Sequence, residues 1–415
     1  GSCEKISEFN LPVVLTDTSN QTKNNIAQCV EKALLSFSPD IVLDLSDQPV
    51  LSFADRMQLA NLILSKGVSY KGADFLFEAK KTVISTENPA ISIEGLSKRA
   101  GKTAAAATAA KFISKKFKPI IITMGRGGPE KPELIEGDKI KITPEFLLEQ
   151  SVAGKHAGGD NYENALIAQV PVIGCRRAGG GFTGAVFYST VREGALLANS
   201  LNRDFQIYVG SGTTSPPVQI DARIIIISAY QSPDNILDGF GALRIKEADT
   251  IVITGCESPP SKPDSPDRIE KICREINPEA RVIQTIFRPQ PLGSIKNKRV
   301  VFATTAPKSV LPLIVRYLEE TYSCNIGSVI SSLSNREKLS SDLEKVFLLK
   351  TPPEVLLTEL KAASVDVGVR SAIAYGINVV FCHNSIIEKE GGRTRFSDEI
   401  KKLMTITVSR FKKRR

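Results

Sequence analysis

The segment Gly95–Thr103 has the residue types and spacing of a loop that binds phosphate groups. It reads GLSKRAGKT, follows the apolar run Ala90–Ile93 and precedes the alanine-rich stretch 104–110, so a short strand leads into it and a helix leaves it. The loop glycines let backbone N–H groups converge on phosphate oxygens, and the helix N-terminus adds partial positive charge. Lys102 is predicted to reach the β- and γ-phosphates of a nucleotide, and the Thr103 hydroxyl is predicted to ligate Mg²⁺.

The loop is longer than the standard phosphate loop, because five residues rather than four separate Gly95 from Gly101. This G-x(5)-G-K-T form resembles the loop of dethiobiotin synthetase and of related enzymes that transfer phosphate to small acids. Lys98 and Arg99 lie inside the loop, where they either neutralise the phosphates of a bound molecule or face solvent. The predicted nucleotide-binding residues are Gly95, Lys98, Arg99, Gly101, Lys102 and Thr103.

Two further segments that combine glycine with arginine follow predicted strands. Gly125–Pro129, GRGGP, comes directly after the apolar run Ile120–Met124, and 174–181, GCRRAGGG, comes after another such run. Because ligands of open α/β sheets bind at the carboxyl ends of the strands, Arg126 is expected to face the same crevice as the phosphate loop. A third segment, 154–163, GKHAGGDNYE, carries both charge signs among its glycines.

Together the three segments predict a site for a heavily phosphorylated ligand, because bare backbone N–H groups and guanidinium groups both bind phosphate. One such segment alone would be an ordinary turn. His156 lies beside Lys155 in the third segment, and imidazole can also pair with phosphate. The predicted substrate-binding residues are Arg126, Gly127, Gly128, Lys155, His156, Arg176, Arg177, Gly179 and Gly180, and the predicted catalytic residues are Lys102, Arg126, Lys155 and His156.

The predicted magnesium ligands are oxygen donors: the Thr103 hydroxyl with the carboxylates of Glu133 and Asp160. Glu130 is an alternative carboxylate, and a purely solvent-exposed role is open for each acid. Because the sequence shows no cluster of His, Cys and carboxylate residues, no transition-metal site is predicted. His383 follows an apolar run, so a role in a site and a role in the core are both open.

Composition indicates a folded, soluble chain of two or three domains. Its 415 residues are 42% apolar and 24% charged, with a net charge of +9, part of which lies in the terminal run 410–415. That run is either a solvated tail or a docking arm. The other basic residues of the chain are scattered along the sequence, which favours small phosphorylated ligands over nucleic acid as binding partners. Seven widely spaced cysteines indicate a reducing cytoplasm, and the absence of a window of about 18 uncharged apolar residues predicts no membrane span.

Short apolar runs alternate with amphipathic stretches, which predicts an α/β fold with a mostly parallel sheet. The expected domains are an N-terminal α/β domain at 1–85, a central P-loop domain at 86–296 and a C-terminal α/β domain at 297–415. The segment 257–267, ESPPSKPDSPD, is expected to be a loop. The expected strands lie at 11–15, 41–45, 91–93, 120–124, 170–174, 205–209, 223–228, 250–254, 282–287, 300–303, 346–349, 355–357 and 379–382, and the expected helices at 25–37, 53–66 and 102–117.

Several segments together resemble the cyclic 2,3-diphosphoglycerate synthetase family of methanogenic archaea. They read GLSKRAGKT, ITMGRGGPEKPELIEG, GKHAGGDNYENALIAQVPVIGCRRAGGG, FRPQPLG, VVFATTAP, SSLSNR and LLTELKAASVDVGVR, and the likeness runs from DIVLDLSDQPV at residue 40 to FCHN at residue 381. The resemblance implies a cytoplasmic, homodimeric ligase that uses ATP and Mg²⁺ and is stimulated by K⁺. Its implied reaction converts 2,3-bisphosphoglycerate into the cyclic phosphoanhydride and releases ADP and phosphate.

The chain departs from the pattern expected of that family. Ala178 stands where a cysteine is expected, and Val209 stands where an acidic residue is expected before Gly210. Valine cannot bind a metal ion, so either a carboxylate such as Glu133 takes that role or the chain is a weakened variant. By the same comparison, we expect the N-terminal domain to lack the opening strand and helix of the family. Two other functions stay open: a kinase that phosphorylates 2-phosphoglycerate and stops, and a regulatory P-loop protein.

Overall fold

The computed structural model describes residues 12, 23–48, 50–82, 84–237, 239–389 and 395–415. The strand expected at 11–15 lies outside these residues except for Pro12. The chain forms two compact units, of which one comprises Gly1–Lys81 with Leu237–Glu247 and the other Thr82–Ile236 with Ala248–Arg415. Residues 86–296 and 297–415 therefore lie mainly in the same compact unit, and their separation into two domains stays a prediction.

The smaller unit packs helices against a three-stranded sheet of order β1-β2-β3. A capping box starts α2, since the Ser52 hydroxyl accepts from the Asp55 N–H at 3.3 Å while the Asp55 carboxylate accepts from the Ser52 N–H at 3.1 Å. Buried side chains of α2 meet Phe240 and Leu243 in one apolar cluster. The elements are α1 (Lys23–Phe37), β1 (Ile41–Leu43), α2 (Phe53–Ser65), β2 (Ser69–Lys71), β3 (Leu76–Phe77) and α8 (Gly241–Lys246), which confirms the helices expected at 25–37 and 53–66.

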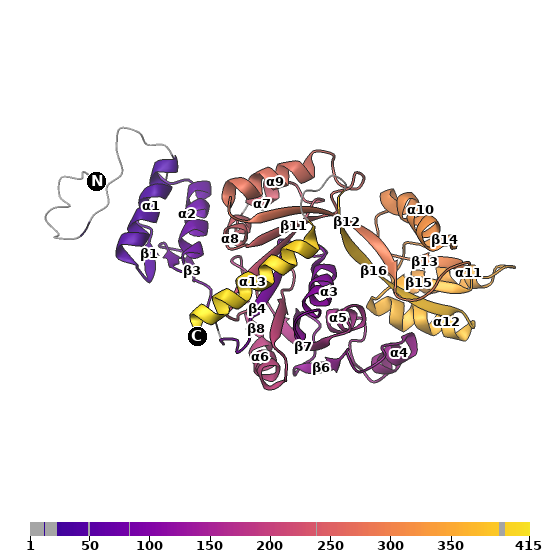
Figure 1. Cartoon of the computed structure of the whole chain (residues 1–415). Helices are drawn as coiled ribbons and strands as arrows, with labels where there is room; N and C mark the ends of the chain where they lie inside the picture. Colours follow the sequence, from indigo (N-terminus) through magenta and orange to yellow (C-terminus); the bar gives the residue numbers. More distant parts are fainter. Residues whose placement is uncertain (1–11, 13–22, 49, 83, 238, 390–394) are drawn as a thin grey trace. The chain divides into compact units, whose positions relative to one another are not determined.

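The larger unit contains a 13-stranded, mostly parallel sheet whose strand order is β14-β13-β15-β16-β12-β11-β10-β4-β9-β5-β7-β6, with β8 beside β7. Its central strands are apolar on both faces because helices cover both sides (Figure 1). The strands are β4 (Ala90–Gly95), β5 (Pro119–Gly125), β6 (Glu133–Glu136), β7 (Pro171–Ala178), β8 (Tyr188–Ser189), β9 (Phe205–Val209), β10 (Ala222–Ser228), β11 (Thr250–Thr254), β12 (Arg281–Pro291), β13 (Arg299–Ala303), β14 (Asn325–Ile330), β15 (Val355–Glu359) and β16 (Asn378–Glu388).

Two long strands join the P-loop part of this sheet to its C-terminal part. Strand β12 runs parallel to β11 over Arg281–Gln284 and then antiparallel to β16 over Thr285–Pro291. Strand β16 in turn pairs with β15 through Asn378–Cys382. The sheet is therefore continuous through both parts, because each long strand has one partner in each.

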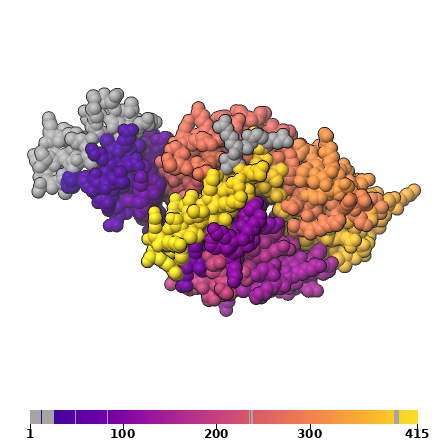
Figure 2. Space-filling model, in the orientation of Figure 1, coloured from indigo at the N-terminus to yellow at the C-terminus, as the bar shows by residue number. Residues whose placement is uncertain are grey.

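The helices of the larger unit include α3, whose buried alanines allow a close approach to the sheet. Helix α13 packs on α3 and on strands β4 and β10, and Figure 2 shows it in yellow at the surface. The helices are α3 (Lys102–Ile113), α4 (Pro144–Val152), α5 (Asp160–Ala168), α6 (Val191–Ser200), α7 (Asp234–Leu237), α9 (Ser265–Ile276), α10 (Leu311–Tyr322), α11 (Arg336–Phe347), α12 (Arg370–Ala374) and α13 (Phe396–Arg414), with a 3₁₀ turn at Lys308–Val310 and a π-helical segment at Ser364–Val369. Among the described residues, no helix is both long and apolar enough to cross a bilayer.

Two expectations about local structure are wrong. The strand expected at 346–349 is the end of α11, where Leu339, Leu343 and Phe347 recur at helical spacing and are buried. The loop expected over 257–267 ends earlier, because α9 begins at Ser265 with Pro266 in its first turn, where proline is tolerated.

The basic run 410–415 is neither a solvated tail nor a free arm. It forms the last turn of α13, and its Phe411 is buried. Arg414 pairs with the buried Asp221 at 2.7 Å, and Arg410 pairs with Asp249 at 2.7 Å. These ion pairs fasten α13 to the loops that precede β10 and β11.

Candidate active site

The phosphate loop joins β4 to α3, as the sequence predicts. Gly101 at the start of α3 has a φ of +96°, and a β-carbon there would lie 2.7 Å from the Phe287 ring, so only glycine fits. The Thr254 hydroxyl, at the end of β11, donates to the Ala100 carbonyl at 2.7 Å. Lys102 Nζ donates to the Ser97 carbonyl at 2.9 Å and so curls back over the loop.

Lys102 is held between the phosphate loop and the segment after β9. Its ammonium group donates to the Gly212 carbonyl at 3.2 Å. Burial lowers the pKa of Lys102 to about 8, while the charge of Asp160 acts to raise it and that of Arg177 to lower it. The loop lysine thus lies within electrostatic range of one carboxylate from α5 and one guanidinium from β7.

Arg177 is the second anchored cation of the site and is only 7% exposed. It donates through Nη1 to the Gly179 carbonyl at 2.7 Å and through Nη2 to the Ser211 carbonyl at 3.0 Å. Lys102 and Arg177 are therefore fixed by the carbonyls of two consecutive residues, Ser211 and Gly212.

The Arg177 Nε is buried and has no hydrogen-bond partner among the described residues. A buried donor left unpaired is costly, and a buried guanidinium even more so, which favours an anion as its partner. Burial and the nearby Arg126 both lower the pKa of Arg177. Arg177 thus lies within electrostatic range of both Lys102 and Arg126, two cations that follow other strands.

The loop after β5 brings Arg126 and His156 to the same cluster. A β-carbon on Gly127 would lie 3.4 Å from His156 Nε2, so the imidazole rests on this glycine. The Arg176 Nε donates to the Gly128 carbonyl at 2.7 Å and thereby supports the loop. Because successive side chains of a strand point to opposite faces, Arg176 faces away from Arg177, although both were predicted to bind the substrate.

The other predicted residues occupy more varied positions. Lys98 lies beside Gly212, since a β-carbon on that glycine would be 3.8 Å from Lys98 Cγ. Arg99 is exposed, with a φ of +58°. Gly95 lies under the Lys102 ammonium, and Gly180 lies beside Arg177 Nη1.

The predicted magnesium ligands differ in the contacts that they already make within the protein. Glu133 on β6 pairs with Lys155 at 2.8 Å and accepts from the Tyr162 hydroxyl at 3.3 Å. Asp160 is exposed and lies in range of Lys102, and Thr103 lies in the first turn of α3. The described residues contain no group of three or more His, Cys, Asp or Glu side chains that could hold a metal ion. Mg²⁺ needs only one or two carboxylates beside phosphate oxygens, so Thr103 with Asp160 is a suitable donor pair.

Two residues that depart from the family pattern, Val209 and Ala178, lie on strands around the site. His383 lies on a strand as well. Val209 is 3% exposed and lies in the core. Ala178 is the exposed last residue of β7. Burial and, to a smaller extent, Lys111 lower the pKa of His383 to about 4, and its Nε2 lies 3.1 Å from Gln290 Oε1 across the β12–β16 pair. His383 therefore has a core role, as a neutral imidazole in the join of the sheet.

Sequence reasoning missed several residues that hold the site together. Ser211 and Gly212 anchor both main cations, and their position directly after a predicted strand was the available signal. Glu163 and Lys361 form an ion pair across 198 positions of sequence. No spacing pattern reports such a distant contact.

Gly128 should be intolerant of any side chain, because a β-carbon there would lie 2.1 Å from the Cys175 carbonyl oxygen. Gly128→Ala is expected to lower the free energy of unfolding by about 1–3 kcal/mol, since the loop must move away from β7. Chemical denaturation measures this difference. Gly327→Ala is the matched control, because a β-carbon there meets open space. Equal stability of the two variants would contradict the packing described for the loop.

Comparison with known proteins agrees with this geometry. The P-loop domain of cyclic 2,3-diphosphoglycerate synthetase matches residues 90–286, its C-terminal domain matches 291–385 and its N-terminal domain matches 1–78. The cyclic 2,3-diphosphoglycerate synthetase of Methanothermus fervidus is 44% identical over 391 residues, which are 94% of this chain and 84% of that protein. The protein of the same name from Methanothermobacter thermautotrophicus is 42% identical over 387 residues, 93% of this chain and 83% of that protein.

Among solved structures, LpxK from Aquifex aeolicus in complex with ATP is similar over 91% of this chain and 99% of its own, with 15% identity and a TM-score of 0.47. The assignment does not depend on that likeness. The three matched domains and the sequence identity to full-length relatives decide it. The chain belongs to the cyclic 2,3-diphosphoglycerate synthetase family of P-loop ligases.

Proposed function

We propose that this chain uses ATP to close 2,3-bisphosphoglycerate into cyclic 2,3-diphosphoglycerate, with release of ADP and phosphate. The observation that carries the proposal is the joint anchoring of Lys102 and Arg177 on Ser211 and Gly212. It supports a site in which the phosphate loop faces a second group of cations, as two adjacent polyanions require. The names of the relatives supply the substrate.

In this proposal the two ligands take different parts of the cation cluster. The amides of the loop and Lys102 hold the phosphates of ATP, and Thr103 with Asp160 would hold Mg²⁺, which supplies positive charge beside the transferred phosphoryl group. Arg177, Arg126 and His156 hold the phosphates and carboxylate of the substrate. The Nε of Arg177, which has no partner among the residues that the structure describes, supplies a donor that is already desolvated.

The reaction then proceeds in two displacements. An oxygen of one substrate phosphate attacks the γ-phosphorus of ATP, and the bond from that phosphorus to the ADP oxygen breaks. The first substrate phosphate is now joined to the former γ-phosphate by an anhydride bond. An oxygen of the other substrate phosphate attacks the phosphorus of that first substrate phosphate, the ring closes, and the former γ-phosphate leaves as inorganic phosphate. Phosphate oxygens are already nucleophiles, so the protein contributes positioning and charge neutralisation rather than a general base.

Phosphorus NMR on the full chain with ATP, Mg²⁺ and 2,3-bisphosphoglycerate tests the proposal. The expected result is the resonance of a cyclic phosphoanhydride that grows with ADP and inorganic phosphate in equal amounts. A linear product from 2-phosphoglycerate without a cyclic species would instead indicate the kinase. Nucleotide binding with no phosphorylated product from either substrate would indicate the regulatory protein, and both results would overturn the proposal.

Affinity for ATP should fall as the pH rises through the pKa of Lys102, which burial lowers to about 8. Only the ammonium form of Lys102 binds phosphate. Below this pKa the lysine already carries its proton, whereas above it the lysine must take up a proton when ATP binds. We expect Kd to rise by about tenfold per pH unit above pH 8, until the pKa of the complex is reached. Isothermal titration between about pH 7 and about pH 9.5 measures this.

Lys102→Arg is the control for that pH dependence, because a guanidinium stays charged throughout the range. Its Kd should be flat where that of the unaltered chain rises. A rise of the same slope in both proteins would assign the titration to another group. Stimulation by K⁺, pairing of two copies and a cytoplasmic location stay predictions from the family resemblance.

A further inference from the structure

We propose that Lys361, which belongs to the C-terminal part of the larger unit, is a positioning residue of the reaction and acts through Glu163 on α5. Its ion pair fixes the start of α5 and the loop 153–159 before it, which carries Lys155 and His156. The expected effect on turnover rests on the proposed function, whereas the contacts themselves do not.

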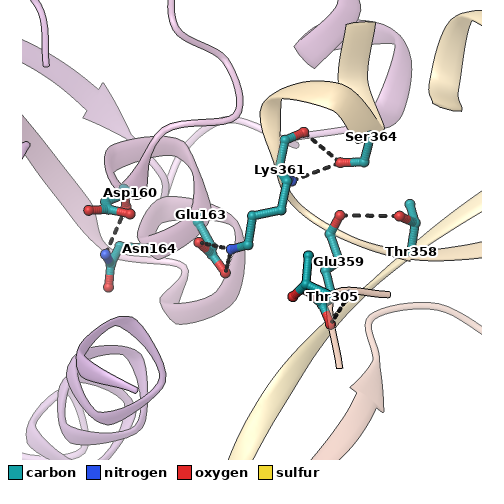
Figure 3. Close-up of polar contacts among 8 residues, drawn as sticks. All are labelled: Asp160, Glu163, Asn164, Thr305, Thr358, Glu359, Lys361 and Ser364. Atoms are coloured by element: carbon teal, nitrogen blue, oxygen red, sulfur yellow. Dashed lines mark hydrogen bonds and ion pairs between the residues drawn. The ribbon is translucent and has the colours of Figure 1, made fainter. Parts of the chain in front are cut away.

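The ion pair crosses from the end of β15 to α5. Lys361 Nζ lies 3.0 Å from one carboxylate oxygen of Glu163 and 3.2 Å from the other (Figure 3). The side chain of Glu163 is only 13% exposed, and that of Lys361 is 42% exposed. The pair therefore lies at the rim of a buried contact, where screening by water is incomplete.

The backbone of Lys361 is itself fixed. Its N–H donates to the Ser364 hydroxyl at 2.7 Å, and that hydroxyl donates to the Lys361 carbonyl at 2.6 Å. Just before it, the Glu359 carboxylate accepts from the hydroxyls of Thr304 and Thr305, each at 2.6 Å, and Figure 3 shows the contact with Thr305. The side chain of Lys361 therefore extends from a backbone turn that is held in place at the ends of β13 and β15.

Two further contacts hold the same stretch of chain. A β-carbon on Gly158 would lie 2.3 Å from the backbone nitrogen of Ala362, so the loop before α5 packs directly on the backbone beside Lys361. The Ser151 hydroxyl, at the end of α4, donates to the Asp366 carboxylate at 2.6 Å. The segment from α4 to α5 is therefore held at three points by residues 361–366.

The charges around Lys361 keep it an ammonium group. Burial opposes the charged form, but Glu163, Glu359 and Asp160 outweigh it and raise the pKa of Lys361. Burial also raises the pKa of Glu163, against the attraction of Lys361. Without the lysine, three acids would face one another with little compensation, and the start of α5 would move or take up a proton.

Asp160 connects this cluster to the phosphate loop. It lies three residues before Glu163 on α5, and residues three apart are neighbours on the surface of a helix. Its charge acts on the pKa of Lys361 and on that of Lys102. A displaced α5 would therefore shift Asp160 relative to the phosphate loop and His156 relative to Arg126.

Lys361→Met tests the inference, because methionine keeps most of the length and removes the charge. We expect kcat for the cyclic product to fall by about 10²-fold. Kd for ATP, measured without Mg²⁺ and without substrate, should change far less than kcat, because Lys102 keeps its contacts with Ser97 and Gly212. Glu163→Gln should have the same effect, and the double variant should be no worse than either single one, because the two side chains act as one pair.

Two variants separate positioning from a general loss of structure. Lys361→Arg retains the charge and should restore most of kcat. Lys345→Met removes an exposed lysine from the last turn of α11 and should leave kcat unchanged. If Lys361→Met lowers the temperature of unfolding but leaves kcat unchanged, the ion pair only stabilises the structure, and the inference is overturned.

Hydrogen–deuterium exchange supplies a readout that does not need the reaction. In Lys361→Met, the amides of Ala157 and Gly159, which now donate within the loop, should exchange at least about tenfold faster, while amides of α3 stay unchanged. If the unaltered chain forms no cyclic product, the proposed function fails and the exchange result still decides whether Lys361 positions the loop. Unchanged exchange in that loop would overturn the inference alone.

Discussion

Lys102→Met is expected to lower kcat by about 10³-fold or more, the largest effect of any single change in the molecule. In the proposed mechanism the ammonium group donates to the transferred phosphoryl group, and methionine fills the same space without charge. Unfolding should occur at the same temperature or higher near pH 7. Burial lowers the pKa of Lys102 to about 8, so the folded chain disfavours its charged form, and that cost is fully present below about pH 8.

Steady-state kinetics and calorimetry of the same preparation measure both effects. Lys115→Met is the matched control, since its ammonium lies over the Phe112 ring and away from the loop. That variant should keep its kcat. If the kcat of Lys102→Met lies within about tenfold of that of the unaltered chain, the loop lysine does not stabilise the transition state.

Arg177→Met should reduce kcat/KM for bisphosphoglycerate by about 10²–10³-fold. The guanidinium bridges the carbonyls of Gly179 and Ser211, and its buried Nε has no hydrogen-bond partner in the described part of the chain. Its loss removes charge from the place where the proposed mechanism brings the two polyanions together, and it also loosens Ser211, next to the anchor of Lys102. We therefore expect kcat to fall and KM for the substrate to rise together.

Two comparisons make the Arg177 prediction specific. Arg177→Lys keeps the charge but loses the planar fork, so only part of the activity should return. Arg203→Met breaks an ion pair with Asp138 at the amino end of β9 and should leave KM unchanged. Equal KM values for the unaltered chain and Arg177→Met would place the substrate elsewhere.

The phosphate loop and the strand ends around it were predictable because local sequence encodes them. Glycine spacing, an apolar run before the loop and alanines after it place β4, the loop and α3 with errors of a few residues at the helix end. The rule that ligands bind at the carboxyl ends of strands then brings Arg126 and Arg177 toward Lys102, and the electrostatic effects between these groups agree with it.

Other features depend on distant contacts and could not be predicted. Consecutive arginines at 176 and 177 look equivalent in sequence, yet the pleat of β7 turns them to opposite faces. The pair of Glu163 with Lys361 exists because β15 and α5 meet in space. Helix α13 was missed although Phe396, Ile400, Leu403, Thr407 and Phe411 recur at helical spacing, because the basic residues at its end drew the interpretation toward an extended tail.

The pairing of β12 with β16 restricts how the molecule can close on its ligands. Swinging β16 and the strands beyond it away from β12 would break the backbone ladder from Thr285 to Pro291, which is intact in the described part of the chain. A closing motion that separates β16 from β12 is therefore too costly. The two long strands must therefore move as one unit, and exchange of the C-terminal third with that of a relative should succeed only if both strands are carried together.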